Sequence, residues 1–393
     1  MKRFKYILYV LAAISLITCK QPYTPAPTTT ITNYLVVEGL INISDSTYIN
    51  LSRTVNISAS TTVNPELKAT VTIESNQGGS YQLSELGNGV YAAAPLNLSA
   101  VNQYRLRIKT NTGGQYVSDF TPTMISPPID SVTWAAKSTS LEIYANTHDP
   151  NNATHYYRWD YSEAWEFHPN YQSSWISDGI NIIPRTSAQD IWTCYTGDFS
   201  HVVALGSSVG LSRDVINEGL VNTIPSDAER ISVEYTILIK QYALTKDAND
   251  YWTLLKKNTE QLGSIFDAQP SASIGNVHAV TNPAEIVIGY ISAGTISTKR
   301  IFIFKSQLPA WKTTPFYNPC PSEYVDCCDP YGFPPFPTRN EVINFKSPLF
   351  YGGVPYIPIF GVGGDPPAGF VAALPICVDC TIRGSKIPPA YWK

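Results

Sequence analysis

One short motif in this sequence could carry a nucleophile. Residues 206–210 read Gly-Ser-Ser-Val-Gly, which matches the G-x-S-x-G pattern with Ser208 at its centre. In hydrolases that pattern lies on a strained turn between a strand and a helix, and the turn exposes the serine above a parallel sheet. The flanking residues here show no alternation of strands and helices. A glycine-rich loop is the better interpretation, so we expect no catalytic residue and no enzymatic activity; a secreted hydrolase using loop residues is the alternative.

The start of the chain carries a different kind of chemistry. A basic segment (MKRFK) and an apolar run over 6–17 lead to Cys19. This is the pattern of a secretory signal, and the run is too short to remain as a transmembrane helix. A cysteine in this place is the one that bacterial lipoproteins acylate, although Thr18 differs from the small residue that usually precedes it. We expect residues 1–18 to be a signal peptide and Cys19 to be lipidated; ordinary cleavage that leaves a free thiol is the alternative.

The other six cysteines indicate cross-links. An even number of cysteines in an exported protein is typical of disulfides, and six of them allow 15 pairings. Zinc binding by a 377-x-x-380 pair and the adjacent cysteines is the alternative, but an oxidising compartment favours disulfides, so we expect no metal site and no cofactor. The disulfide candidates are Cys194, Cys320, Cys327, Cys328, Cys377 and Cys380.

Aromatic residues are the candidates for ligand binding. Between 156 and 161 they alternate, with Tyr157, Trp159 and Tyr161 on one face, which is typical of a sandwich core. Beyond that strand the aromatic residues have no clear inward face. We therefore take them as the candidate binding surface for a small molecule or glycan: Trp165, Phe167, Tyr171 and Trp175.

Composition and charge exclude some partners. The net charge of −4 becomes −7 when Lys2, Arg3 and Lys5 leave with the signal peptide, and no basic block remains. Nucleic-acid binding needs clustered Lys and Arg, so we expect no nucleic-acid partner. Attachment to a membrane must then come from acyl chains, at about 0.8 kcal/mol for each buried methylene.

Strand patterns dominate the region after a proline-containing tether at 19–33. Short alternating segments separated by glycine turns predict an N-terminal β-sandwich at 34–125. After the Ser-Pro-Pro at 126–128, similar segments predict a second sandwich at 126–305, with a loop insertion at 167–230. The predicted fold is therefore mainly β, with two antiparallel sandwiches of the immunoglobulin or fibronectin kind in series.

One helix and an unusual tail complete the predicted architecture. Ala248, Trp252, Leu255 and Leu262 form one helical stripe, which predicts a helix over 246–262 that Thr245 caps. Residues 306–393 hold 16 of the 30 prolines and five of the six cysteines that follow Cys19. Such a segment is poorly suited to helices and central strands, so we expect an irregular, disulfide-stapled wrap packed on the second domain.

A series of short motifs in the second half resembles a known family. They are, in order, 156–159 (YYRW), 250–252 (DYW), 261–267 (QLGSIFD), 269–271 (QPS), 275–277 (GNV), 281–283 (TNP), 287–290 (VIGY), 377–384 (CVDCTIRG) and 389–392 (PAYW). In this order they resemble the domain-of-unknown-function 4249 family of Bacteroidetes envelope lipoproteins. The resemblance implies an outer-membrane lipoprotein whose gene neighbours often encode TonB-dependent transporters. It implies no activity and no catalytic residues.

These observations together predict a lipid-anchored envelope protein of the outer membrane. We expect a non-enzymatic binding or accessory module associated with a TonB-dependent transporter; a structural or adhesive surface lipoprotein is a further alternative. The residues after Cys19 are not acidic, as they often are in surface-exposed lipoproteins of this group. The sequence therefore leaves periplasmic or cell-surface facing open.

Overall fold

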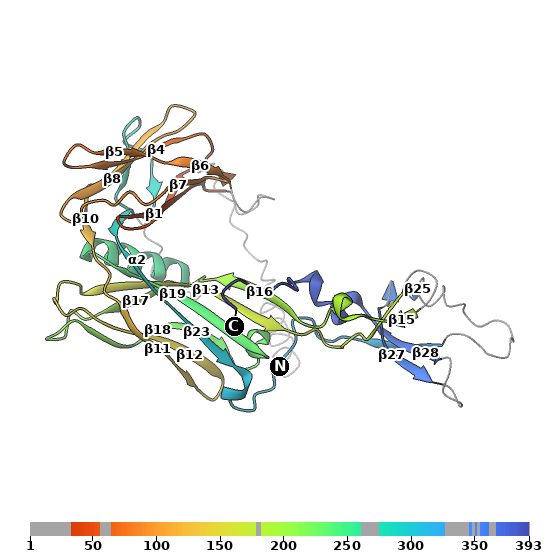
Figure 1. Ribbon diagram of the computed structural model, residues 1–393. Coiled ribbons are helices and arrows are strands. Elements are labelled where there is room, and N and C mark those ends of the chain that lie inside the picture. Colours follow the sequence, from red (N-terminus) through yellow and green to blue (C-terminus); the bar gives the residue numbers. More distant parts are fainter. Residues whose placement is uncertain are drawn as a thin grey trace, which may run out of the picture.

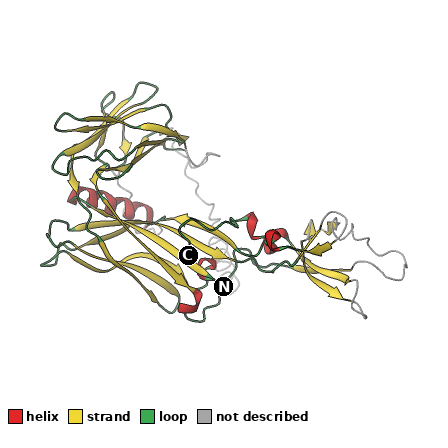
Figure 2. Cartoon of the chain, in the orientation of Figure 1, coloured by secondary structure: helices red, strands yellow, loops and turns green. Residues whose placement is uncertain are grey.

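The chain is mainly β, as predicted (Figure 2). The computed structural model describes residues 33–55, 64–177, 182–260, 275–326, 346–347, 350–351, 354–360 and 367–392. The signal peptide, the tether up to residue 32, and Cys19, Cys327 and Cys328 lie outside the described residues, as does the predicted end of the helix at 261–262.

The first sandwich consists of two layers joined at one strand. Strand β10 pairs with β8 in one layer and with β22 in the other. The strands of this sandwich are β1 (Leu35–Asn42), β2 (Thr47–Arg53), β3 (Asn64–Pro65), β4 (Thr70–Ser75), β5 (Ser80–Gln82), β6 (Ser84–Gly87), β7 (Val90–Ala93), β8 (Gln103–Lys109), β9 (Gln115–Ser118), β10 (Thr121–Met124), β20 (Val277–Ala279), β21 (Val287–Ile288) and β22 (Ser292–Gly294).

Alternation along the strands builds the core of this sandwich. In β8, Tyr104, Leu106 and Ile108 are buried between the layers. The residues between them point outward, where Arg105 and Arg107 both bind the Glu74 carboxylate. Period-two patterning of this kind is what the sequence showed, and it places one face of each strand in the core.

The boundary predicted between the two domains is wrong in one respect. Residues 277–294 were assigned to the second domain, but strands β20, β21 and β22 complete the sheets of the first one. Val277, Ile291 and Ala293 are buried in the first core. These strands are two or three residues long, so their pattern carries no information about the sheet that they join. The chain therefore crosses between the two sandwiches three times: it enters the second after β10, returns to the first before β20, and enters the second again after β22.

The second sandwich packs a three-stranded sheet against a larger one. The smaller sheet has the order β11-β12-β18, and the larger one is built around β13 and β19. Its strands are β11 (Ile129–Ala136), β12 (Ser140–His148), β13 (Tyr156–Phe167), β16 (Cys194–Phe199), β17 (Ala204–Ser207), β18 (Val215–Pro225), β19 (Glu234–Ala243) and β23 (Ile296–Phe304). Tyr157, Trp159 and Tyr161 face its core, as the alternation predicted.

The predicted loop insertion at 167–230 is wrong in large part. It contains β16, β17 and β18, and β18 is an eleven-residue strand paired along β12. The pairing of β18 shifts register twice, and Glu218 beside Gly219 has a positive φ of 54°. Each bulge reverses the side on which the next residue lies, so the alternation is lost although the strand continues.

Helix α2 (Lys246–Glu260) confirms the predicted helix over the described residues. The Thr245 hydroxyl accepts a hydrogen bond from the Ala248 amide at 3.1 Å, as an N-cap does. Ala248 and Tyr251 are buried. Figure 1 shows α2 lying between the first sandwich and the large sheet of the second.

The C-terminal segment is less irregular than predicted. It holds a three-stranded sheet in the order β24-β28-β27, which Figure 1 shows at the end of an arm apart from the second sandwich. Pro355 and Pro358 lie in edge strand β27, and Pro367 is the first residue of central strand β28, which are positions that tolerate proline. The elements of the arm and the short helices are β14 (Trp175–Ser177), β15 (Ile182–Pro184), β24 (Ser322–Asp326), β25 (Lys346–Ser347), β26 (Phe350–Tyr351), β27 (Val354–Phe360), β28 (Pro367–Ala373), α4 (Pro375–Val378), η1 (Ser187–Gln189), η2 (Glu229–Ile231), η3 (Lys305–Gln307) and η4 (Cys380–Ile382).

Two disulfides and a set of ion and ring contacts hold the tail in place. Cys320 pairs with Cys377 inside the tail, and Cys194 of β16 pairs with Cys380. Arg383 forms two 2.8 Å contacts with the Glu229 carboxylate. These contacts fix the end of the tail on the second domain, whereas the prediction that the whole tail packs on that domain is wrong for the sheet of the arm.

A buried carboxylate in the second core depends on one arginine. The Glu163 side chain is 1% exposed and contacts Arg230, and it accepts a 2.5 Å hydrogen bond from the Tyr235 hydroxyl. Burial raises the pKa of Glu163, while Tyr235 and Arg230 act in the opposite direction. Removal of the arginine would leave a buried carboxylate without a counter-charge.

We expect a fragment of residues 34–125 to remain unfolded, because it lacks the strands supplied by 277–294. The measurement is the dispersion of amide resonances in a two-dimensional NMR spectrum, with the full chain as reference. A dispersed, cooperatively melting fragment would contradict the need for the returning strands.

We expect Arg230→Met to destabilise the protein by up to about 3–5 kcal/mol. Burial raises the folded-state pKa of Glu163, and removal of the Arg230 charge, which lowers that pKa, raises it further. The buried carboxyl is therefore tolerated in its neutral form at pH 5, and the loss of stability in the variant grows as the pH rises to 8. Urea denaturation at both pH values measures it. Arg213→Met, an exposed arginine, is the control and should change stability by less than about 0.5 kcal/mol. Equal losses at the two pH values would contradict this account.

Candidate functional site

The outer face of β13 meets the first sandwich and α2. Because side chains alternate along a strand, Arg158 and Asp160 lie on the face opposite the buried Trp159. The register between β13 and β19 sets Arg158 opposite Tyr242 and Asp160 opposite Lys240. Four polar or aromatic side chains therefore form one patch on the large sheet.

Arg158 is held by aromatic rings rather than by hydrogen bonds. Its guanidinium carbon lies 4.0 Å from the centre of the Trp252 ring, which α2 supplies, and 4.4 Å from the centre of the Tyr242 ring. Its only ion pair among the described residues is with Asp160, at 3.1 Å. The side chain is 15% exposed, and its Nε is buried with no hydrogen-bond partner. An unpaired buried donor costs about 1–3 kcal/mol, so this arrangement needs an explanation.

A cleft opens beside this arginine, between the two sandwiches. Its volume is about 450 Å³, and more of its lining is apolar than polar. One wall is β1 and β2 of the first sandwich, with Glu38 and Tyr48; α2 and the segment at 288–290 complete it. Concave, largely apolar spaces at domain interfaces with a few convergent polar groups are where proteins bind small ligands.

The tyrosines of the cleft remain neutral. Burial, and secondarily the Glu38 carboxylate, raises the pKa of Tyr251 to about 12. Burial and then Asp160 raise the pKa of Tyr242, and burial raises that of Tyr290. These phenols therefore offer hydroxyl groups and ring faces at neutral pH.

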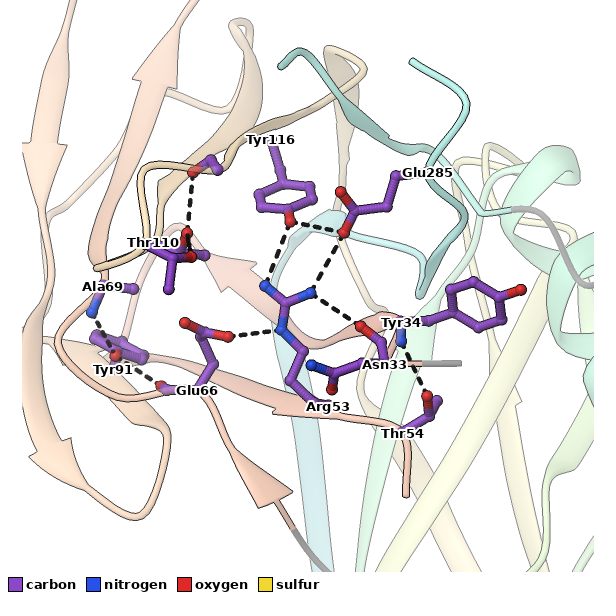
Figure 3. A network of polar contacts seen from close by, with 12 residues as sticks. Asn33, Tyr34, Arg53, Thr54, Glu66, Ala69, Tyr91, Thr110, Tyr116 and Glu285 are labelled. Carbon is purple, nitrogen blue, oxygen red and sulfur yellow. Dashed lines mark hydrogen bonds and ion pairs between the residues drawn. The ribbon is translucent and has the colours of Figure 1, made fainter. Parts of the chain in front are cut away.

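A second arginine, Arg53, has a hydrogen-bond partner at every nitrogen of its guanidinium (Figure 3). Arg53 lies 2.6 Å from Glu66 and 3.3 Å from Glu285, and it donates to the Tyr116 hydroxyl at 3.3 Å and to the Asn33 carbonyl. All three of its nitrogens have partners, and those partners come from both layers of the first sandwich and from the 277–294 segment. Arg53 is a cross-link of the fold, whereas Arg158 has one ion pair and an Nε without a hydrogen-bond partner.

The residues of the G-x-S-x-G motif do not have the order of contacts of a Ser-His-Asp triad. Ser208 is 1% exposed, and its hydroxyl donates to Asp214. His155 Nδ1 lies 3.4 Å from the Ser208 hydroxyl, so the serine lies between the other two residues, and no carboxylate of the described residues orients the histidine. Tyr157 donates to the other Asp214 oxygen. This group closes a loop beside the second core.

The first glycine of the motif has a packing role. A β-carbon on Gly206 would lie 2.7 Å from Cζ3 of the Trp159 indole, and one on Gly219 would lie 2.8 Å from its Cη2. The ring of Trp159 therefore needs glycine on two neighbouring strands. Gly210, at the other end of the motif, has open space around it.

The predicted aromatic surface is wrong in part. Phe167 is fully buried, beside the Cys194–Cys380 disulfide and with Arg383 4.3 Å from its ring centre. Trp165 packs against the second core under Arg230. Tyr171 is half-buried and donates to the Cys320 carbonyl. The disulfide-bonded tail covers these residues and gives them the inward face that the sequence pattern did not show; Trp175, in β14, remains half-buried.

The described cysteines are engaged in disulfides. Cys377 and Cys380 bond different partners, so they do not form the zinc-binding pair considered as an alternative. In the part of the chain that the structure describes, no three metal-ligating side chains of His, Cys, Asp or Glu come together. The described helices include none that is long and apolar enough to span a membrane.

Sequence reasoning missed Arg158, Asp160 and Tyr242 as functional candidates. The alternation that placed Trp159 in the core also placed Arg158 outside it, which was a usable signal. Trp252 was assigned to the packed stripe of the helix, and it does pack, but on the arginine of the cleft. The pairing of two strands 80 residues apart is not visible in the sequence.

Comparison with known protein families identifies a family to which the sequence is similar. A family model described as Domain of unknown function (DUF4249) matches residues 20–300. No curated protein matches the chain. A two fibronectin type-III domain segment from chicken tenascin is similar at 12% identity over 54% of this chain and 92% of that chain, with a TM-score of 0.15. At that TM-score the similarity supports no argument.

We expect Gly206→Ala to destabilise the protein by about 1–3 kcal/mol, because the added methyl group overpacks Trp159. Gly210→Ala is the matched control in the same motif and should have little effect. Urea denaturation followed by tryptophan fluorescence measures both. Similar losses in the two variants would contradict the packing role.

Proposed function

The chain belongs to the family described as Domain of unknown function (DUF4249), and we propose that it is a lipid-anchored, non-enzymatic binding protein of the outer membrane. In this proposal Cys19 carries the lipid, and the protein is an accessory of a TonB-dependent transporter. A family of unknown function and a fold of two sandwiches fit a non-catalytic accessory or adhesive module. The association with a TonB-dependent transporter is the more specific part of the proposal.

The observation that supports binding most strongly is the cleft between the two sandwiches. Its walls come from two domains that are joined by three chain crossings, so its shape does not depend on a single linker. Its polar groups include Arg158, whose Nε has no hydrogen-bond partner among the described residues. A site of this kind selects and holds a ligand, which is what an uptake accessory does.

A structural or adhesive role is the second candidate, and the arm supports it. The sheet of β24, β28 and β27 lies away from the second sandwich, while disulfides secure the chain at its base (Figure 1). A projecting element with a covalently fixed base suits contact with another surface. The hydrolase alternative is less well supported, because Ser208 is buried and donates to Asp214.

We expect the tagged, lipidated protein to recover a TonB-dependent transporter in stoichiometric amount when it is purified from its own cells in mild detergent. The measurement is mass spectrometry of the eluate. Cys19→Ala is the matched control: without acyl chains it should leave the membrane fraction, because those chains supply the anchoring energy. Recovery of the lipidated protein alone would count against the transporter and favour the adhesive role.

A further inference from the structure

We propose that the cleft binds a ligand with a carboxylate attached to an apolar body, and that Arg158 holds the carboxylate. This inference rests on the binding role proposed above and names the class of ligand. The cleft provides charged side chains from β13 and β19, and apolar side chains from β1, α2, β21 and β23. A ligand with one anionic end and an apolar remainder matches both parts.

The unused donors of Arg158 define the charged end. A guanidinium has five N–H donors in a fixed fork, and this one forms a single ion pair and no side-chain hydrogen bond among the described residues. Every nitrogen of Arg53, in contrast, has a protein partner. In proteins, the planar guanidinium of arginine commonly binds carboxylates and phosphates through two parallel hydrogen bonds.

The aromatic rings keep Arg158 in position before a ligand arrives. Trp252 and Tyr242 lie close to its guanidinium, on a helix and on a strand that are each packed into the fold. A side chain that is held in this way loses little freedom when it binds, and pre-organisation of this kind increases affinity.

The balance of charge favours a carboxylate over a phosphate. Arg158 and Lys240 are the cations that line the cleft, and Asp160 and Glu38 are the anions. A phosphate carries two negative charges, and the carboxylates of Asp160 and Glu38 would both repel it. A carboxylate carries one negative charge, which the Arg158 guanidinium alone can balance. The lining therefore suits a monoanion.

The apolar length sets the size of the ligand. The volume of about 450 Å³ lies in the range of about 300–1,000 Å³ that is usual for small-ligand sites. Leu40, Tyr48, Leu255 and Tyr290 line this part. A short apolar peptide with a free C-terminus and a free aryl or acyl carboxylic acid share this chemistry, and an experiment can separate them.

The test is calorimetric titration of the full chain in detergent with three probes: N-acetyl-leucyl-phenylalanine, its C-terminal amide and 4-phenylbutyrate. We expect at least one of the two acids to bind, and the amide to bind about 10- to 100-fold more weakly than the dipeptide acid if that acid binds. Binding of the dipeptide acid identifies a peptide as the source; binding of phenylbutyrate alone identifies a free acid. If neither acid binds at concentrations up to about 1 mM, or if acid and amide bind equally, the proposal is overturned.

Variants assign the binding to the cleft. Arg158→Leu should weaken an acid that binds by about 10- to 100-fold, and Arg158→Lys, which keeps the charge but loses the fork, by less. Arg300→Leu is the matched control, because Arg300 also lies over an aromatic ring, that of Tyr391, but outside the cleft. Unchanged affinity in a folded Arg158→Leu protein would overturn the assignment. The comparison of acid with amide in the wild type stands even if that variant does not fold.

Failure of this inference can be told apart from failure of the proposed function. If the transporter co-purifies while neither acid binds, the accessory role stands and only the ligand class is wrong. If an acid binds through Arg158 while no transporter is recovered, the ligand class stands and the partner is wrong.

Discussion

The repeated crossing of the chain between the two sandwiches is the constraint on which the rest of the structure depends. The chain leaves the first sandwich after β10, returns at β20 and leaves again after β22, and the two strands from which it leaves, β10 and β22, pair side by side. Just beyond them, the buried Gln241 side chain donates to the Pro127 carbonyl and to Thr147, and it accepts a hydrogen bond from the Trp159 indole. One amide thus ties the crossing to both sheets of the second core. An unpaired buried amide is costly, so this network favours a single arrangement.

The fixed joint gives β13 two separate roles. Its inner face, with Tyr157 and Trp159, builds the core of the second sandwich. Its outer face presents Arg158 to the space that the joint leaves beneath the first sandwich. Helix α2 follows β19 directly, so Trp252 reaches the same place. A chain that crossed only once could swing, and β1 would then not form a stable wall for the cleft.

How much of this could be predicted from the sequence depends on how local each feature is. The alternation of 104–108 and 157–161, the helix at 246–260 and the cross-linking of the tail were all visible, because each follows from neighbouring residues. The return of 277–294 to the first sandwich was not visible, because strands of two or three residues have no period. The bulged strand β18 was misread as a loop for a related reason. The cleft was missed because its residues come from β1, β13, β19 and α2, and only the fold brings these together.

The central claim is that the cleft beneath the first sandwich is a ligand site organised by Arg158. The most direct measurement is a crystal structure of the protein purified from its own cells, with attention to the density beside that side chain. The account predicts the two sandwiches in the arrangement described, with a small molecule whose anionic end meets the Arg158 guanidinium and whose apolar part extends toward Tyr48. A first sandwich turned away from α2, or a closed cleft with Arg158 paired to protein groups through all its nitrogens, would contradict it.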